Sequence, residues 1–292
     1  GPIGTEMAQA FHRLGSQVIL VDALDRLLPR DDSELSENFT QLLKKEGVDV
    51  RLNFKVQKVT KTEKGWQVEH HQQKLFGEQL LIALGRQANV ADLNLEKAGI
   101  TYNQDQIKVN KYLRTTAPNI WAAGDCVGGY RFSHIAEVEA KIAVRNALFP
   151  FNSRPNYQGA PWTTFTEPEL AHLGLTEQEC RQKNMKYQVY YQSFNEDDRA
   201  ITDGTIEGKV KIIATPFGRL LGVHILGPRA GELINEFTLA YRKKMRLSEI
   251  GLTIHVYPTL GMALQRATDQ WFSEWAEKPW AKFIMKIFRQ LT

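Results

Sequence analysis

The sequence predicts an α/β fold of the open dinucleotide-binding (Rossmann-like) kind for residues 1–88, and three observations support this prediction. The chain opens on a turn between two glycines that leads into a helix-forming segment at 5–11. The short apolar run 18–21 has the composition of a buried strand. Residues 31–45 carry apolar side chains at helical spacing and stop at Gly47. This alternation of helix and strand predicts a parallel sheet covered by helices.

Strand patterns dominate the rest of this first domain. They occupy residues 48–54, 56–60, 66–69 and 79–84. Gly65 and Gly77 lie between them as turns. We expect a β-meander followed by one last apolar strand, and we expect the first strand of the domain to precede Gly1.

Two further units follow. Residues 89–157 contain a helix pattern at 133–149 and two strand-like runs, at 107–109 and 115–125, before a linker rich in proline, asparagine and glycine. Residues 158–276 combine helix and strand patterns and are predicted to form an α+β domain. Its markers are a strand pair at 209–214 and 219–226 around a turn at 215–218, and an amphipathic helix at 230–245.

Composition excludes several classes of function. The net charge is +4 and is spread along the chain, which argues against a nucleic-acid-binding face. No apolar run is long enough to span a bilayer. The two cysteines, Cys126 and Cys180, lie far apart without metal-binding spacing, so we expect no metal site, no disulfide framework and a cytoplasmic location.

The first turn carries half of a dinucleotide fingerprint. Gly1 and Gly4 match the last two glycines of G-x-G-x-x-G, where a helix N-terminus holds a pyrophosphate. Asp22 follows the next strand, where a carboxylate bonds the ribose 2′-hydroxyl and repels a 2′-phosphate. These residues favour NAD(H) over NADP(H), although Arg26 and Arg30 could weaken the discrimination. A glycine turn and a solvated aspartate remain the alternatives.

Two motifs carry a specific resemblance. Residues 84–89 read LGRQAN, and residues 115–125 read TTAPNIWAAGD. Together they resemble the pyridine nucleotide–disulfide oxidoreductases, in particular the mercuric reductase-like and dihydrolipoamide dehydrogenase-like branch. The resemblance implies that 89–157 is the C-terminal part of an FAD-binding domain and that 158–276 forms a homodimer. It also implies a longer protein whose N-terminal FAD domain carries a cysteine pair.

The resemblance also implies cofactor-binding residues. These are Glu6, Gly85, Arg86, Gly124, Asp125 and His134. A glycine lets the backbone approach a ligand and a carboxylate accepts hydrogen bonds from hydroxyls, so Gly124 and Asp125 suit the ribityl chain of FAD. Glu6 would lie near the junction of flavin and nicotinamide, or be solvated. His134 would contact the flavin, or simply cap or pack against the helix.

The chain departs from the family at its expected proton-transfer pair. Dihydrolipoamide dehydrogenase-like members place a histidine directly before a Pro-Thr pair and a glutamate four residues after the proline, whereas Tyr257 and Met262 stand at those positions here. Mercuric reductases and soluble transhydrogenases resemble this chain in having a tyrosine near this site. A tyrosine, with a pKa of about 10, is a poor base at neutral pH. His255 is two residues away and would either replace the base or bond locally. Tyr257 and His255 are therefore the catalytic candidates.

We expect an FAD-dependent enzyme that passes hydride from NAD(P)H through the flavin to a small-molecule acceptor, such as a disulfide or a metal ion. A flavin transhydrogenase or diaphorase that needs no disulfide is one alternative, and a nucleotide- or redox-sensing module without catalysis is another. Residues 277–292 form a predicted amphipathic helix. That helix would dock on another domain or make a peripheral membrane contact.

Overall fold

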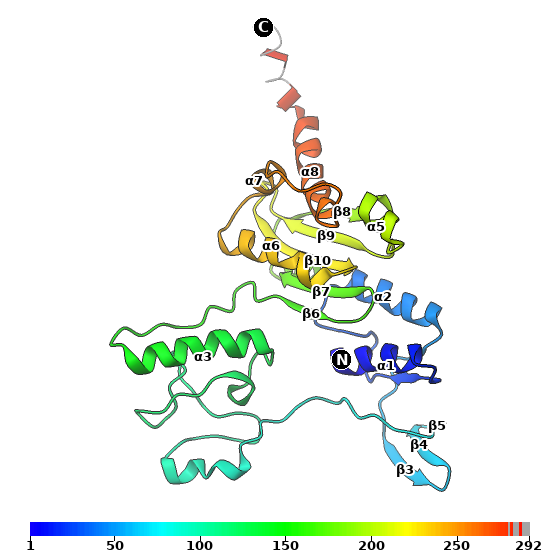
Figure 1. The fold of residues 1–292 in the computed structure, drawn as a ribbon, viewed down its shortest axis with the longest axis vertical. Coiled ribbons are helices and arrows are strands. Elements are labelled where there is room, and N and C mark those ends of the chain that lie inside the picture. Colours follow the sequence, from blue (N-terminus) through cyan, green and yellow to red (C-terminus); the bar gives the residue numbers. More distant parts are fainter. Residues whose placement is uncertain (280, 283–285, 288–292) are drawn as a thin grey trace. The chain divides into compact units, whose positions relative to one another are not determined.

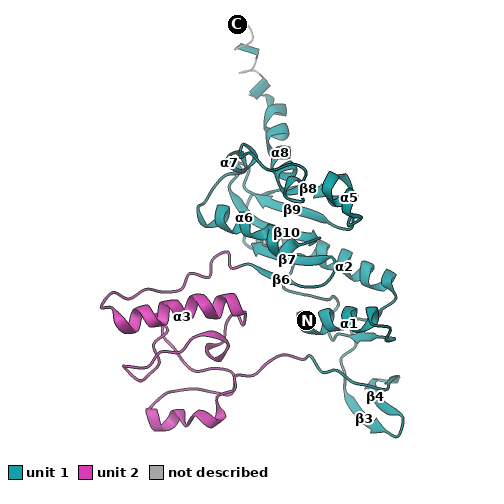
Figure 2. Cartoon of the chain, viewed as in Figure 1, with its two compact units in different colours: residues 1–83, 161–292 teal, residues 84–160 magenta. Residues whose placement is uncertain are grey.

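A computed structural model describes residues 1–279, 281–282 and 286–287 of the chain (Figure 1). The chain divides into two compact units (Figure 2). The larger unit contains residues 1–83 together with 161–292, and the smaller unit contains residues 84–160. In the larger unit, the first segment of the chain therefore packs with the C-terminal sheet rather than forming a separate body.

The first elements of the larger unit include a βαβ arrangement. Helix α1 (Pro2–Arg13) begins at a proline, which has no N–H to leave unpaired at a helix start. Strand β1 (Ile19–Val21) pairs in parallel with β2 (Asp49–Arg51), and α2 (Ser33–Glu46) connects them. Gly47 ends α2 with a left-handed φ of 114°. The predicted helix, strand and helix stop are confirmed.

A three-stranded antiparallel meander follows, made of β3 (Lys58–Thr62), β4 (Gly65–His70) and β5 (Gln73–Gly77). The predicted strand at 79–84 is wrong. Among the described residues that segment pairs with no strand, and Ile82 within it is 71% exposed. An apolar segment becomes a strand only when a neighbouring strand takes its backbone hydrogen bonds, and the composition of the segment does not reveal whether one is present.

The second part of the larger unit is built on a five-stranded antiparallel sheet in the order β6-β7-β10-β9-β8. Its strands are β6 (Trp162–Thr164), β7 (Glu169–Gly174), β8 (Gln188–Ser193), β9 (Lys209–Ala214) and β10 (Leu220–Gly227). The predicted strand pair is confirmed as β9 and β10, joined by a turn in which Gly218 N–H donates to Thr215 O at 2.8 Å. The predicted helix is α6 (Ala230–Arg242).

Helices cover both faces of this sheet, which is why every residue of the central strand β10 is buried. Helices α6 and α8 (Gly261–Glu277) pack on one face, where Ile212, Val223 and Phe237 share the largest core. Helix α2 packs on the other, where its Phe39 meets Leu170 and Leu226. The remaining helices of the unit are α4 (Glu177–Gln182), α5 (Asp198–Asp203) and α7 (Leu247–Gly251).

The smaller unit contains one long helix, α3 (Ser133–Leu148), as predicted, and three short 3₁₀ turns. Those turns are Ala91–Leu93, Leu95–Ala98 and Gly124–Val127. The prediction of strand-like runs at 107–109 and 115–125 is wrong, because these residues make only isolated bridges. Ile107 pairs with Tyr102, and Trp121 pairs with Arg114. Loops of this kind depend on side-chain hydrogen bonds, such as those from Asn146 to the carbonyls of Tyr112 and Ser153.

Most of the predicted amphipathic helix at 279–292 lies outside the described residues, which omit 280, 283–285 and 288–292. Within the part of the chain that is described, no helix combines the length and the apolar character that crossing a bilayer requires.

Candidate functional site

The start of α1 and the end of β1 lie side by side, as a dinucleotide site requires. The Gly1 nitrogen lies 3.4 Å from Asp22 Oδ2. Asp22 Oδ1 accepts a hydrogen bond from Leu24 N–H at 3.0 Å, which fixes the carboxylate at the strand end. A Cβ on Gly4 would lie 3.4 Å from Ala83 Cβ, which is ordinary van der Waals contact, so Gly4 stands where the helix meets the segment before Leu84 without being required there by space. The structure brings Gly1, Gly4 and Asp22 together.

The two arginines near Asp22 make contacts elsewhere. Arg26 Nη2 donates to Pro29 O at 2.6 Å, and the guanidinium of Arg30 lies over the Trp162 ring at 5.1 Å. Glu6, the other predicted residue of α1, accepts a hydrogen bond from Phe165 N–H at 2.8 Å. Its carboxylate therefore ties α1 to the segment that precedes β7.

In the smaller unit, Gly124 lies in a position that only glycine fills without strain. Its φ is 81°, and an added Cβ would lie 3.0 Å from Ala136 Cβ on α3. Its N–H donates to the buried Glu139 Oε2 at 2.7 Å, and the second oxygen of that carboxylate accepts from Tyr157 OH. Burial, followed by this carboxylate, raises the pKa of Tyr157. Sequence reasoning missed Glu139, whose only signal is an acid on the inner face of a helix.

Asp125 follows directly and points its carboxylate at Arg86, with Nη1 and Oδ2 2.7 Å apart. Both side chains are about half exposed, at 48% for Asp125 and 46% for Arg86. Arg86 also donates to Arg131 O, and Arg131 donates to Arg86 O and to Asp105 O. Gly85 has a φ of 126°, which turns the chain into this arrangement. The structure thus brings Gly85, Arg86, Gly124 and Asp125 into one corner.

His134 lies at the start of α3, where its ring stacks on Phe132 with the centroids 5.4 Å apart and the planes 9° apart. Cys126 Sγ donates to Ala123 O at 3.3 Å, and burial raises the pKa of its thiol. Cys126 and the buried Cys180 are both free. No group of acids, histidines and cysteines within the described ranges has the geometry of a metal site.

The catalytic candidates lie in the segment between α7 and α8. Tyr257 is 64% exposed, and the nearby Asp198 carboxylate raises the pKa of Tyr257 above its ordinary value. His255 turns inward, and both of its ring nitrogens are engaged. Nε2 lies 2.8 Å from Glu236 Oε1 and Nδ1 lies 2.8 Å from Thr253 O. A His–Glu pair is therefore present, although its partners stand at other positions than the family pattern predicts.

The C-terminal sheet carries a feature that the sequence did not reveal, which we call the cross-strand row. Residues in register on all five strands face α2: Tyr191, Lys211, His224, His172 and Trp162. Lys211 is only 1% exposed, and its Nζ lies 3.0 Å from Asp32 Oδ2 and 2.9 Å from Glu34 Oε2. The acids that begin α2 therefore neutralise the centre of a sheet that lies far along the chain.

Burial and ion pairing oppose each other along this row. Burial acts to lower the pKa of Lys211, but the carboxylates of Asp32, Glu177 and Glu34 outweigh it and raise the pKa. Burial acts to raise the pKa of Glu34, but hydrogen bonds led by that from Lys209 lower it to about 2. At the other end of the row, burial raises the pKa of Asp31 to about 7 even though Trp162 Nε1 donates to it at 2.9 Å.

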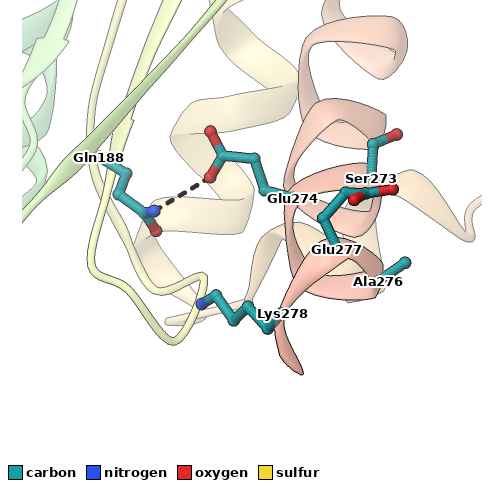
Figure 3. Close-up of a pocket in the computed structure, with 6 residues that line it drawn as sticks. All are labelled: Gln188, Ser273, Glu274, Ala276, Glu277 and Lys278. Carbon is teal, nitrogen blue, oxygen red and sulfur yellow. Dashed lines mark hydrogen bonds between the residues drawn. The ribbon is translucent and has the colours of Figure 1, made fainter. Parts of the chain in front are cut away.

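One open pocket lies between β8 and α8, and none of the predicted site residues lines it (Figure 3). It is lined by Gln188, Ser273, Glu274, Ala276, Glu277 and Lys278. Gln188 and Glu274 point toward one another, and Glu274 Oε2 accepts from Gln188 Nε2 at 3.0 Å and from Tyr190 OH at 3.2 Å. Its central carboxylate thus already serves to join α8 to the sheet, which gives this pocket a structural role.

The group Gly1, Gly4 and Asp22, the group around Asp125 and the C-terminal sheet all fit one assignment. The chain belongs to the pyridine nucleotide-disulphide oxidoreductase family. The family's sequence profile matches residues 1–140, and the profile of its dimerisation domain matches residues 160–268. The predicted family and fold are confirmed: a nucleotide-binding α/β part is followed by an α+β dimerisation domain.

Individual relatives agree with this assignment. A dihydrolipoyl dehydrogenase of Thermus scotoductus is 36% identical over 92% of this chain, and a mercuric reductase of Bacillus cereus is 33% identical over 91%. The HOCl-induced flavoprotein disulfide reductase RclA from Escherichia coli is 31% identical and superposes over 92% of the chain with a TM-score of 0.87. The chain spans about 60% of the length of the first relative, 43% of the second and 62% of RclA.

Proposed function

We propose that the protein to which this chain belongs is an FAD-dependent oxidoreductase that passes hydride from NAD(H) through the flavin to a small-molecule acceptor. The observation that carries this proposal is the corner formed by Gly124 and Asp125 in a chain of this family. Bound FAD supplies the redox chemistry, because it accepts a hydride from one partner and releases electrons to the next. The residues of the chain hold and orient the two cofactors.

The flavin corner fits the ribityl arm of FAD. The backbone at Gly124 leaves no space for a Cβ against Ala136, which suits a chain segment that a ligand approaches closely. Asp125 is accessible and presents an oxygen that accepts hydrogen bonds from hydroxyls. Arg86 would then exchange its bond to Asp125 for one to the ligand, with Gly85 allowing the turn, and His134 would contact the flavin from the start of α3.

The nucleotide corner fits NAD(H). The N-terminus of α1, between Gly1 and Gly4, offers free N–H groups and a positive dipole to a pyrophosphate. Asp22 would bond the ribose 2′-hydroxyl, and its charge would repel a 2′-phosphate. Glu6 would lie near the nicotinamide ring while holding Phe165. This charge arrangement favours NADH over NADPH.

We assign residues 1–88 to NAD(P) binding, 89–157 to FAD binding and 158–276 to the dimer. The match to a dimerisation domain supports a homodimer, in which Tyr257 would act near the flavin of the second subunit. Because the Asp198 carboxylate raises the pKa of its phenol, Tyr257 would serve as a neutral hydrogen-bond donor and not as a base. We place the protein in the cytoplasm, where its nicotinamide substrate is found.

A transhydrogenase or diaphorase is the second candidate. Tyr257 and Met262 replace the proton-transfer pair of the disulfide-reducing relatives, which favours an acceptor that needs no thiol chemistry. A purely sensing module would bind the same cofactors without turnover. Steady-state oxidation of NADH with disulfide, metal-ion and quinone acceptors in parallel separates these three functions.

The proposal is tested with the complete gene product. We expect a yellow protein whose flavin absorbance is bleached by NADH without oxygen, and a colourless protein would refute the proposal. Asp125→Asn should weaken flavin binding on the order of tenfold or more, because a charged hydrogen bond contributes about 1.5–3 kcal/mol. Asp92→Asn is the matched control, since Asp92 is an exposed acid of the same unit and should leave the affinity unchanged.

A further inference from the structure

The segment 252–260, between α7 and α8, carries Tyr257 but has no regular secondary structure. Its apolar side chains Leu252, Ile254 and Val256 are exposed, so they do not anchor it within this chain. Local hydrogen bonds hold its two ends. Gln265 Nε2 donates to Thr253 O at 3.2 Å, and Thr259 Oγ1 donates to Val256 O at 2.7 Å.

His255 is the side chain that ties the middle of this segment to the body of the unit. Its side chain is only 10% exposed although both chain neighbours point outward. One ring nitrogen faces the carboxylate of Glu236 on α6 and the other faces the carbonyl of Thr253, each at 2.8 Å. Both facing atoms are acceptors, so the ring bonds both only when it donates through both nitrogens.

We propose that His255, held between Thr253 and Glu236, is a positioning residue that fixes the segment carrying Tyr257. This ring is not available to touch a substrate, because both nitrogens face acceptors of this chain and only 10% of the side chain is exposed. It instead sets the direction in which the chain leaves residue 255, and two residues later the Tyr257 side chain emerges into solvent. Only the effect of this positioning on NADH-dependent turnover rests on the proposed function.

A second contact defines what this positioning achieves. The carboxylate of Asp198, which pairs with Arg266 Nη2 at 3.2 Å, raises the pKa of the Tyr257 phenol. The phenol keeps this carboxylate as a neighbour only while the segment keeps its path. The charged groups that face these two side chains are Asp197, Asp198 and Arg266 around Tyr257, and Glu236 and Asp269 around His255.

The test follows Tyr257 itself by NMR. Tyrosine is labelled with ¹³C at Cζ, the Tyr257 signal is assigned with a Tyr257→Phe variant, and its titration is measured in dimeric, flavin-loaded protein. In Glu236→Ala and His255→Ala we expect the Tyr257 midpoint to fall toward the ordinary tyrosine value of about 10, because the displaced phenol no longer lies near the Asp198 carboxylate that raises its pKa. NADH-dependent turnover should fall on the order of tenfold, as displaced groups react more slowly.

Two variants act as controls. Glu236→Gln keeps an oxygen that accepts the histidine N–H, so both the Tyr257 titration and turnover should stay as in the unsubstituted protein. Glu232→Ala removes an exposed acid one turn earlier on α6 and should have no effect. Circular dichroism verifies that each variant folds. If His255→Ala does not fold, Glu236→Ala alone provides the test, because Glu236 is 42% exposed and its loss disturbs the packing less.

The positioning role is overturned if Tyr257 titrates alike in the unsubstituted protein and in the folded alanine variants. The outcomes also separate this inference from the proposed function. A shifted Tyr257 titration in a protein that never oxidises NADH rejects the proposed function and retains the positioning role. Full turnover with an unshifted Tyr257 in Glu236→Ala retains the function and rejects the positioning role.

Discussion

Replacing Asp31 by asparagine should remove a large part of the pH dependence of stability. The Asp31 carboxylate is buried at the end of the cross-strand row and accepts one hydrogen bond, from Trp162 Nε1 at 2.9 Å. Burial raises its pKa from 3.8 to about 7. The folded protein therefore keeps this proton where the unfolded chain has released it, so the contribution is fully present below the unfolded pKa and is lost as the pH rises toward about 7.

The expected size follows from the two pKa values. A difference of about three pKa units at about 1.4 kcal/mol per unit gives roughly 4 kcal/mol between about pH 4 and about pH 8. An asparagine oxygen still accepts from Trp162 but carries no proton to lose. The Asn variant should therefore match the unsubstituted protein at acid pH and exceed it by roughly 4 kcal/mol at the alkaline end.

Urea unfolding followed by circular dichroism, at a series of pH values, measures this difference. The difference between variants is needed because burial lowers the pKa of His172 and His224, whose contributions have the opposite sign and are lost as the pH falls. Asp25→Asn, at an exposed acid of the same loop, is the matched control and should leave the curve unchanged. A difference for Asp31→Asn that stays within about 1 kcal/mol across the series would refute the reasoning.

Three further substitutions have defined outcomes. Lys211→Met removes the cation that pairs with the buried Asp32 carboxylate and should lower the free energy of unfolding in urea by about 3–5 kcal/mol. Lys209→Met, at a partly exposed pair, should lower it by at most about 1 kcal/mol. Gly124→Ala should weaken flavin binding in a fluorescence titration more than Gly129→Ala, because both have a positive φ but only Gly124 faces Ala136. Asp22→Asn should lower the ratio of the NADH affinity to the NADPH affinity on the order of tenfold, and an unchanged ratio contradicts the proposed role of Asp22.

Local signals in the sequence predicted much of the fold. The helix that became α2 was recognised from apolar spacing and from Gly47, because caps and periodicity are properties of adjacent residues. The segment 79–84 has the same quality of local signal and is not a strand, since strand formation depends on a partner that the segment does not contain. Element type is therefore predictable from local pattern only where local interactions decide it.

The same distinction applies to the candidate site. Gly124 and Asp125 were found because they belong to one contiguous motif. Glu139 and Glu236 were not found, because each acts on a residue that lies 15 or more positions away in the sequence. Glu139 contacts Gly124, and Glu236 contacts His255. Lys211 looks like an ordinary solvent-facing lysine in the strand pattern, and its burial depends on acids that precede it by 177 to 179 positions.

Asp32 performs two tasks at once, with a consequence for how the molecule opens. Its side chain accepts from the N–H groups of Glu34 and Leu35 at the start of α2, and the same carboxylate holds Lys211 on β9. Fraying of the first helical turn would separate the buried ammonium group of Lys211 from Asp32, its fully buried partner. The end of α2, normally the first part of a helix to exchange its amide hydrogens with solvent, is therefore expected to exchange only when the central sheet does.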